Sequence, residues 1–229
     1  MSLRTTLKPL DRRHAAVLAI DFQDEYRTGA AWPVAGYEEI LRNASRLLDA
    51  ARAAAIPVLH VQAWSAEDSP YTRLMAENTP PAARSGIAGS GGAAICPEVA
   101  PFPGEYVAHK TFPSGFRGTG LAAELQGRKI EELVALGVWT EACLRETVFD
   151  ALYRGHRIWL VKDACGSGTQ AMHRAGMLDL ANRLYGGGVL STANALRWLT
   201  GEPAEGWRFT RPVEFAYERE TLDAMYEAL

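Results

Sequence analysis

The sequence predicts an α/β fold in three layers, with a mostly parallel sheet covered by helices on both faces. Short apolar runs of strand length alternate along the chain with longer segments whose apolar residues recur at helical spacing. The run at residues 15–20 (AAVLAI) is apolar throughout instead of alternating with polar residues. Continuous apolar runs are typical of parallel strands that are buried on both faces.

The elements follow one another in a regular order. The expected strands are residues 15–20, 56–62, 106–110, 133–138, 156–162 and 188–192. The expected helices are residues 37–55, residues 119–126, a segment from Leu144 through Leu152, and residues 171–185. Residues 63–104 lose periodicity and are rich in Pro, Gly, Ser and Ala, which is typical of a lid or a binding loop.

The chain is expected to form one domain over residues 1–200 and a separate tail over residues 201–229. The tail begins with a linker of Pro, Gly and Glu, continues with apolar residues that alternate with polar ones, and ends in a short helix near residues 221–229. An apolar tail has little reason to stay solvated. We therefore expect it to pack on its own domain or on a neighbouring subunit of a homo-oligomer, either a dimer or a tetramer.

Charge and cysteine content exclude several classes of partner. The net charge is −3 and Lys and Arg are spread along the chain, so the sequence shows no cluster of basic residues that would bind nucleic acid or an anionic membrane. No stretch approaches the ~18 apolar residues of a membrane span. Three cysteines at wide spacing argue against a disulfide framework and against a zinc cluster. We expect a cytoplasmic protein that acts on a small molecule.

Three polar residues follow predicted strands: Asp21, Lys110 and Cys143. Taken singly, each has an ordinary explanation as a turn former, a solvated charge or a buried thiol. In parallel sheets, however, sites form at the carboxyl ends of the strands, so these residues can converge on one rim. A thiol, a carboxylate that takes its proton and an ammonium ion that balances charge form a complete set for nucleophilic catalysis.

The surroundings of Cys143 favour this interpretation. Cys143 falls in the first turn of a predicted helix, and Thr140, three residues earlier, is a suitable N-cap. The free N–H groups and the positive end of the helix dipole favour thiolate over thiol. The sequence therefore predicts a reactive cysteine at this helix start.

Four stretches resemble the isochorismatase-like cysteine hydrolase family: AIDFQ at 19–23, KTFPSGF at 110–116, GVWTEAC at 137–143 and VKDAC at 161–165. The resemblance covers roughly residues 12–200 in the order and spacing of that family. It implies a six-stranded parallel sheet, a catalytic triad of Asp21, Lys110 and Cys143, and a cis peptide between Val138 and Trp139. It also implies an oxyanion hole formed by the backbone N–H groups of Trp139 and Cys143.

Departures from the family narrow the expected function. Nicotinamidases carry an Asp and a His as metal ligands after the second strand, where this chain has Ala63 and Ser65. The sequence therefore predicts no metal and no cofactor. It resembles the amidohydrolases for N-carbamoylsarcosine, ureidoacrylate and biuret more than nicotinamidase. The expected reaction is hydrolysis of a small amide, carbamoyl or ureido C–N bond through a thioester, with release of ammonia or an amine.

Two alternatives remain open at this stage. One is a catalytically silent member of the family that binds a small ligand or a partner, and the other is a vinyl-ether hydrolase of the isochorismatase type. Position alone suggests Gln23, Trp64, Phe116 and Trp139 as substrate contacts in an aromatic pocket. Trp64 and Phe116 could equally be core aromatic residues.

Overall fold

The computed structural model, which describes residues 4–66, 68–211 and 213–229, contains one sheet with the strand order β1-β8-β7-β6-β5-β2-β3-β4. The strands are β1 (Arg4–Thr6), β2 (Ala15–Ile20), β3 (Val58–Ala63), β4 (Tyr106–Lys110), β5 (Glu132–Val138), β6 (Arg157–Gly166), β7 (Gly188–Leu190) and β8 (Glu205–Trp207). The helices are α1 (Tyr37–Ala53), α2 (Pro70–Asn78), α3 (Leu121–Gly127), α4 (Arg145–Tyr153), α5 (Gln170–Ala181), α6 (Thr192–Thr200) and α7 (Leu222–Glu227).

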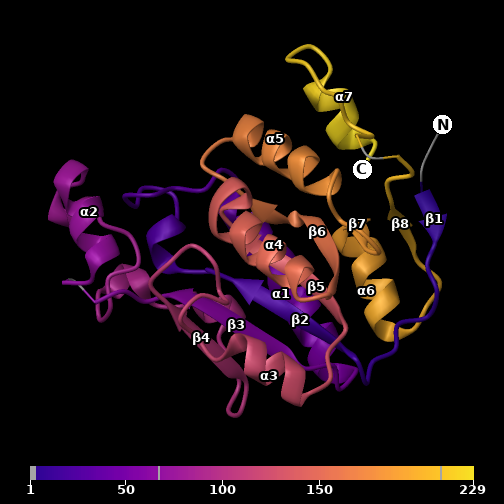
Figure 1. Cartoon of the computed structure of the whole chain (residues 1–229), viewed down its shortest axis with the longest axis horizontal. Helices are drawn as coiled ribbons and strands as arrows, with labels where there is room; N and C mark the ends of the chain where they lie inside the picture. Colours follow the sequence, from indigo (N-terminus) through magenta and orange to yellow (C-terminus); the bar gives the residue numbers. More distant parts are fainter. Residues whose placement is uncertain (1–3, 67, 212) are drawn as a thin grey trace.

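The six strands from β7 to β4 are parallel, as the sequence predicts, and helices cover the sheet on both sides. Helix α1 packs against α6 and β6 on one face, whereas α3 and α4 lie in front of the sheet in the view of Figure 1. The predicted three-layer α/β class is confirmed. Two short strands, β1 and β8, extend the sheet beyond the predicted six and pair antiparallel to each other.

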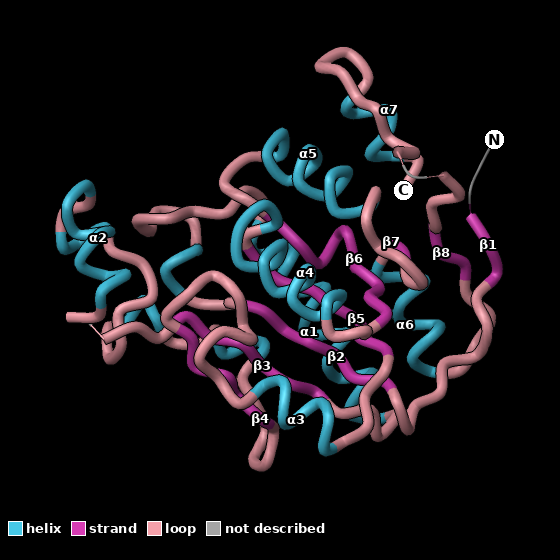
Figure 2. The backbone as a smooth tube through the Cα atoms, in the orientation of Figure 1, coloured by secondary structure: helices cyan, strands magenta, loops and turns pink. Residues whose placement is uncertain are grey.

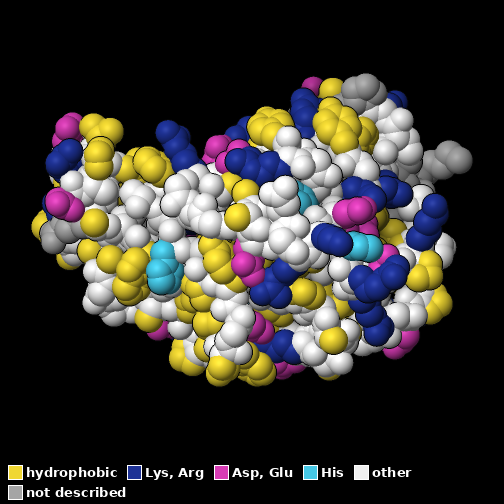
Figure 3. Space-filling view, turned by 60° about the horizontal axis from the view of Figure 1, so that its bottom comes forward, with side chains coloured by type: hydrophobic (Ala, Val, Ile, Leu, Met, Phe, Trp, Pro, Cys, Tyr) yellow, Lys and Arg dark blue, Asp and Glu magenta, His cyan; other side chains and the backbone are white. Residues whose placement is uncertain are grey.

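Burial explains why the central elements form where they do. All six residues of β2 are buried, because β5 and β3 flank the strand and helices cover both of its faces. Helix α1 buries one stripe of apolar residues at helical spacing, namely Ile40, Leu41, Ala44, Leu47, Leu48 and Ala51. Figure 3 shows hydrophobic side chains in several separate groups on one face of the surface, with acidic and basic side chains between them.

Several boundaries differ from the prediction. Strand β6 continues past Lys162 to Gly166, and helix α6 lies in a segment for which no helix was expected. Ser191 caps that helix by accepting a hydrogen bond from the N–H of Asn194. The long segment after β3 is not structureless: it contains α2 and three short 3-10 turns, at Pro81–Ala83, Gly91–Ala93 and Pro97–Val99.

The tail packs on the sheet and helices of its own chain. Strand β8 pairs with β7 and β1, and Trp207 in β8 is buried. The backbone of Phe215 is held by both ends of the Asn182 amide, at 2.9 and 3.0 Å. Helix α7 then lies against α5, as Figure 2 also shows. No helix in the described part of the chain is long and apolar enough to cross a membrane.

Candidate active site

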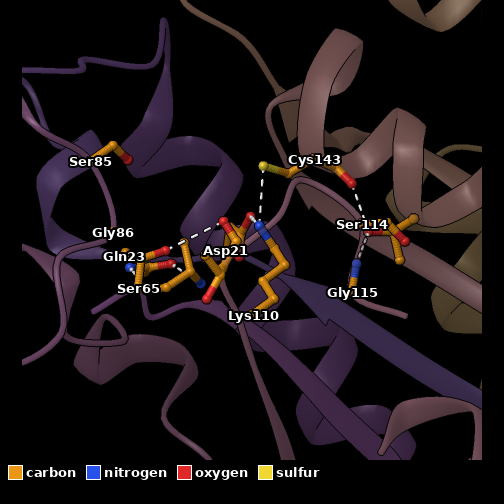
Figure 4. A network of polar contacts seen from close by, with 12 residues as sticks. Asp21, Gln23, Ser65, Ser85, Gly86, Lys110, Ser114, Gly115 and Cys143 are labelled. Carbon is orange, nitrogen blue, oxygen red and sulfur yellow. Dashed lines mark hydrogen bonds and ion pairs between the residues drawn. The ribbon is translucent and has the colours of Figure 1, made fainter. Parts of the chain in front are cut away.

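Asp21, Lys110 and Cys143 meet at the carboxyl ends of β2, β4 and β5, respectively (Figure 4). The Nζ atom of Lys110 lies 2.8 Å from Oδ2 of Asp21 and donates a 3.2 Å hydrogen bond to Sγ of Cys143. The Asp21 and Lys110 side chains are almost fully buried, and Cys143 is partly exposed. The structure thus brings together the three residues that the sequence singled out.

Asp21 is held at the end of β2 by the backbone. Its N–H donates to the carbonyl of Val61 at 2.9 Å, and its φ of +53° lies in the left-handed region, which Asp tolerates better than most residues. Gly137 in β5 passes very close to this point. A Cβ at Gly137 would lie 2.1 Å from the carbonyl oxygen of Ile20, so only glycine lets β5 approach the residue that precedes Asp21.

Cys143 lies in a π-helical turn over Thr140–Leu144, which continues into α4. The peptide bond between Val138 and Trp139, just before this turn, is cis. The prediction that Thr140 caps the helix is wrong, because Trp139 occupies the cap position and the Thr140 side chain points elsewhere. The buried Thr140 hydroxyl donates to the carbonyl of Gly166 at 2.9 Å.

A buried histidine joins this turn to the tail. Nδ1 of His173 in α5 lies 2.8 Å from Oγ1 of Thr140, and Nε2 lies 2.9 Å from the hydroxyl oxygen of Tyr226 in α7. Burial lowers the pKa of His173 to about 4, so the ring is neutral at pH 7. The turn that carries Cys143 is therefore supported from α5 and, through His173, from α7.

Burial changes the expected ionisation of the cysteine. It raises the pKa of the Cys143 thiol to about 12, and the nearby Asp21 charge adds to this, while Lys110 opposes it. Burial therefore opposes the resting thiolate that the helix start was expected to favour. Burial raises the pKa of Asp21, and although burial alone would lower the pKa of Lys110, the adjacent Asp21 carboxylate raises it. The resting site is a thiol beside an ion pair.

A cavity of about 210 Å³ opens above Cys143 and Lys110. Its wall is largely aromatic and apolar, with a few hydroxyl groups, and the described lining residues are Tyr26, Trp32, Ala63, Ser65, Tyr71, Met75, Ser85, Lys110, Thr111, Phe112, Pro113, Trp139, Ala142 and Cys143. Such a cavity, with reactive groups at its base, can hold a small substrate against a nucleophile.

Of the four predicted substrate contacts, only Trp139 lines this cavity. Gln23 is fully buried, and its amide forms hydrogen bonds of 2.8 to 3.1 Å with the backbone of Ala63 and Ala93, so it joins the end of β3 to the 3-10 turn at Ala93. Trp64 stacks on His109. Phe116 is buried against His156. Phe116 therefore packs in the core, whereas Trp64 is half-buried and lies outside the described cavity wall.

Sequence reasoning missed most of the cavity wall. Tyr26 and Trp32 follow β2, Tyr71 and Met75 lie on α2, and Phe112 follows Lys110. The available signal was the aromatic content of the irregular segments after the strands, since loops at the carboxyl ends build the sites of parallel sheets.

Ala63 and Ser65 also line the cavity, at the positions where nicotinamidases would place metal ligands. The described parts of the chain contain no group of three or more His, Cys, Asp or Glu side chains that could hold a metal ion. A methyl group and a hydroxyl do not form a ligand set for zinc, iron or manganese.

Comparison with known proteins gives consistent matches. The isochorismatase domain model matches residues 15–194. The chain is 28% identical to N-carbamoylsarcosine amidase of an Arthrobacter species, over 82% of this chain and 72% of that protein, and 29% identical to maleamate amidohydrolase of Pseudomonas putida, over 82% and 87%. The solved structure of N-carbamoylsarcosine amidase from Thermoplasma acidophilum matches with a TM-score of 0.65 and 27% identity, over 78% of this chain and 96% of that one.

Proposed function

Because this chain belongs to the isochorismatase family, we propose that it is a cysteine hydrolase that cleaves the C–N bond of a small amide, carbamoyl or ureido compound. One observation carries the proposal: the Cys143 thiol lies 3.2 Å from the Lys110 ammonium, which is 2.8 Å from the Asp21 carboxylate, at the base of a largely apolar cavity. The names of the amidase relatives support the reaction class.

The first half of the reaction forms a thioester. Asp21 takes the proton of Cys143 while Sγ attacks the substrate carbonyl carbon, and the carbonyl electron pair moves onto oxygen. When the tetrahedral intermediate collapses, the C–N bond breaks and protonated Asp21 returns its proton to the leaving nitrogen. Because burial raises the pKa of the thiol, the proton transfer accompanies the attack in this proposal.

The second half regenerates the enzyme. Water attacks the thioester carbonyl and gives a proton to Asp21, and the sulfur leaves as Cys143 is protonated again. Lys110 remains cationic throughout, which stabilises the carboxylate of Asp21 and the charge on sulfur. The backbone N–H groups of Trp139 and Cys143 serve as the oxyanion hole in this proposal, and one such donor is commonly worth about 3 kcal/mol.

The two alternatives receive less support. A vinyl-ether hydrolase of the isochorismatase type would not need the cysteine nucleophile that is present here beside its base. A silent binding protein would not need a buried ion pair against a thiol, since burying charges costs free energy unless they are paired and used.

The test is an ammonia assay on purified protein with a panel of primary amides, carbamoyl amino acids, biuret and ureidoacrylate. Wild-type protein should release ammonia from at least one compound, and Cys143→Ala and Cys143→Ser should lose several orders of magnitude of turnover while keeping the wild-type melting temperature. Cys165→Ala, which removes a buried thiol away from the cavity, is the matched control and should stay active.

Two outcomes would contradict the proposal. Turnover retained in Cys143→Ala would rule out the thioester. If no compound releases ammonia while one of them still raises the melting temperature, the protein is a binding member of the family.

A further inference from the structure

The charges around the cavity disfavour an anionic substrate. Among the described lining residues, Lys110 is the one cationic side chain, and it is already paired with Asp21. A second carboxylate, Glu25, is buried behind Ser85, where its Oε1 accepts hydrogen bonds from Ser85 Oγ at 2.7 Å and from the N–H of Gly86 at 2.9 Å (Figure 4 shows Ser85 and Gly86). Two carboxylates against one ammonium leave no positive charge for a substrate carboxylate.

Arg117 and Arg84 are not among the described residues that line the cavity. Arg117 is exposed and stacks over the Phe112 ring at 4.4 Å from its centroid. Arg84 lines a neighbouring cavity and donates to the carbonyl of Thr79 at 3.4 Å. A substrate carboxylate in the cavity would therefore lose hydration without gaining a cationic partner, and burying an unpaired charge is costly.

The wall of the cavity suits a flat apolar group. The ring of Trp139 meets Tyr26 and Trp32 edge to face, with centroids 6.2 and 6.1 Å away, and Tyr71 lies 5.9 Å from Phe112. Aromatic side chains in such arrangements favour a further ring between them. An apolar cavity of roughly 150 Å³ is enough to bind benzene, so about 210 Å³ accommodates one six-membered ring with a carboxamide.

We propose that the group attached to the scissile carbonyl is neutral and apolar, of about the size of one six-membered ring, and carries no carboxylate. This inference rests on the proposed amide hydrolysis at the same site. It separates this chain from the two named relatives, because maleamate and N-carbamoylsarcosine both carry a carboxylate.

The experiment compares substrates of matched size. 4-Methylbenzamide and 4-carbamoylbenzoate have a similar shape and differ by one negative charge, and benzamide is the smaller reference. We expect kcat/KM to be at least about tenfold higher for 4-methylbenzamide than for 4-carbamoylbenzoate, because only the second must bury a charge. A preference for 4-carbamoylbenzoate, maleamate or N-carbamoylsarcosine would overturn the inference and leave the amide hydrolysis intact.

Calorimetric binding to Cys143→Ala provides a readout that needs no turnover. 4-Methylbenzamide should bind at least about tenfold more tightly than 4-carbamoylbenzoate. If this difference is found but wild-type protein releases no ammonia, the inference on the cavity holds and the proposed function fails. Equal or tighter binding of the carboxylate overturns the inference whether or not the protein is active.

A substitution on α2 tests the role of charge directly. Met75 lines the cavity and is half-buried, so Met75→Lys should place an ammonium group there. This change should raise the ratio of kcat/KM for 4-carbamoylbenzoate over 4-methylbenzamide by about tenfold, whereas the neutral control Met75→Gln should leave the ratio near the wild-type value. An unchanged ratio in Met75→Lys, with the melting temperature preserved, would count against charge as the discriminating factor.

Discussion

The hydroxyl of Thr147 donates a 2.7 Å hydrogen bond to the carbonyl oxygen of Cys143. The hydroxyl oxygen of Thr147 in turn accepts a 3.0 Å hydrogen bond from the N–H of Gly115, in the loop that follows Lys110 (Figure 4). Thr147 is fully buried, so neither bond competes with water. One side chain thus connects the helix that carries the nucleophile to the loop that follows the ammonium group.

Thr147→Val should lower kcat/KM by about tenfold or more with little change in KM, because the N–H of Gly115 loses its partner and the loop can shift relative to Cys143. Thr147→Ser keeps the hydroxyl and should stay close to wild type. Steady-state kinetics and melting temperatures of the two variants provide the check. If both variants lose stability equally and keep kcat/KM, Thr147 has only a packing role.

The pH profile of kcat/KM should rise on the acid side and then stay flat. Asp21 must be ionised to accept the thiol proton, and burial raises its pKa, so the acid limb should lie above the ordinary value of 3.8. The pKa of Cys143 is about 12 and that of Lys110 is raised, so neither group should titrate between about pH 7 and pH 10. A further rise centred near pH 8.5 would show instead that Cys143 ionises at its ordinary pKa.

His173 should make the folded protein less stable in mild acid. The pKa of His173 is lowered from 6.5 to about 4, so the unfolded chain takes up a proton at higher pH than the folded one. Its contribution to stability is complete above pH 6.5 and is lost as the pH falls towards 4, by about 3 kcal/mol in total. Burial also lowers the pKa values of His60 and His156, which act in the same direction.

Chemical denaturation at a series of pH values isolates the contribution of His173 to the pH dependence of the free energy of unfolding. His173→Gln should be less stable than wild type at pH 7, because Thr140 and Tyr226 lose their shared partner, but its stability should depend less on pH. An identical pH dependence in the two proteins would show that His173 is not buried in its neutral form. Tyr226→Phe removes only the hydroxyl that contacts Nε2 of His173, so it should lower the free energy of unfolding by less than His173→Gln does.

Catalysis should survive exhaustive chelation. Ala63 and Ser65 replace the carboxylate and imidazole that would anchor a metal ion, so elemental analysis should find no stoichiometric zinc, iron or manganese. For the same reason nicotinamide should be no better a substrate than benzamide, because no ion is held there to orient the pyridine nitrogen. One equivalent of transition metal, lost together with activity on dialysis, would contradict this expectation.

The parts of the fold that the sequence predicted are those whose signal is local. Strands such as β2 are buried on both faces, so their apolar runs are unmistakable, and the rule on carboxyl ends then places Asp21, Lys110 and Cys143 on one rim. The ionisation of Cys143 could not be predicted in this way. It depends on how deeply the thiol is buried beside Asp21, which is a property of packing between distant segments.

The role of Gln23 could also not be predicted from the sequence. Its position two residues after Asp21 suggested a substrate contact, but its amide satisfies backbone groups at Ala63 and Ala93. Only the folded loops bring those groups to it. Trp32 was missed because it lies in a loop without periodicity. Tyr71 was missed because its segment, rich in Pro, Gly, Ser and Ala, was not expected to contain helix α2.

The pairing of β1 with β8 has a consequence for how the chain folds. Arg4 lies opposite Trp207, so this pair of strands closes a loop that contains nearly all of the described residues. Closing so long a loop costs more conformational entropy than local contacts do, and contacts of this kind slow folding. We therefore expect β8 and the tail after it to dock in one of the last steps. Since Tyr226 in that tail supports His173 beneath the cysteine turn, catalytic competence should appear later in refolding than the parallel sheet itself.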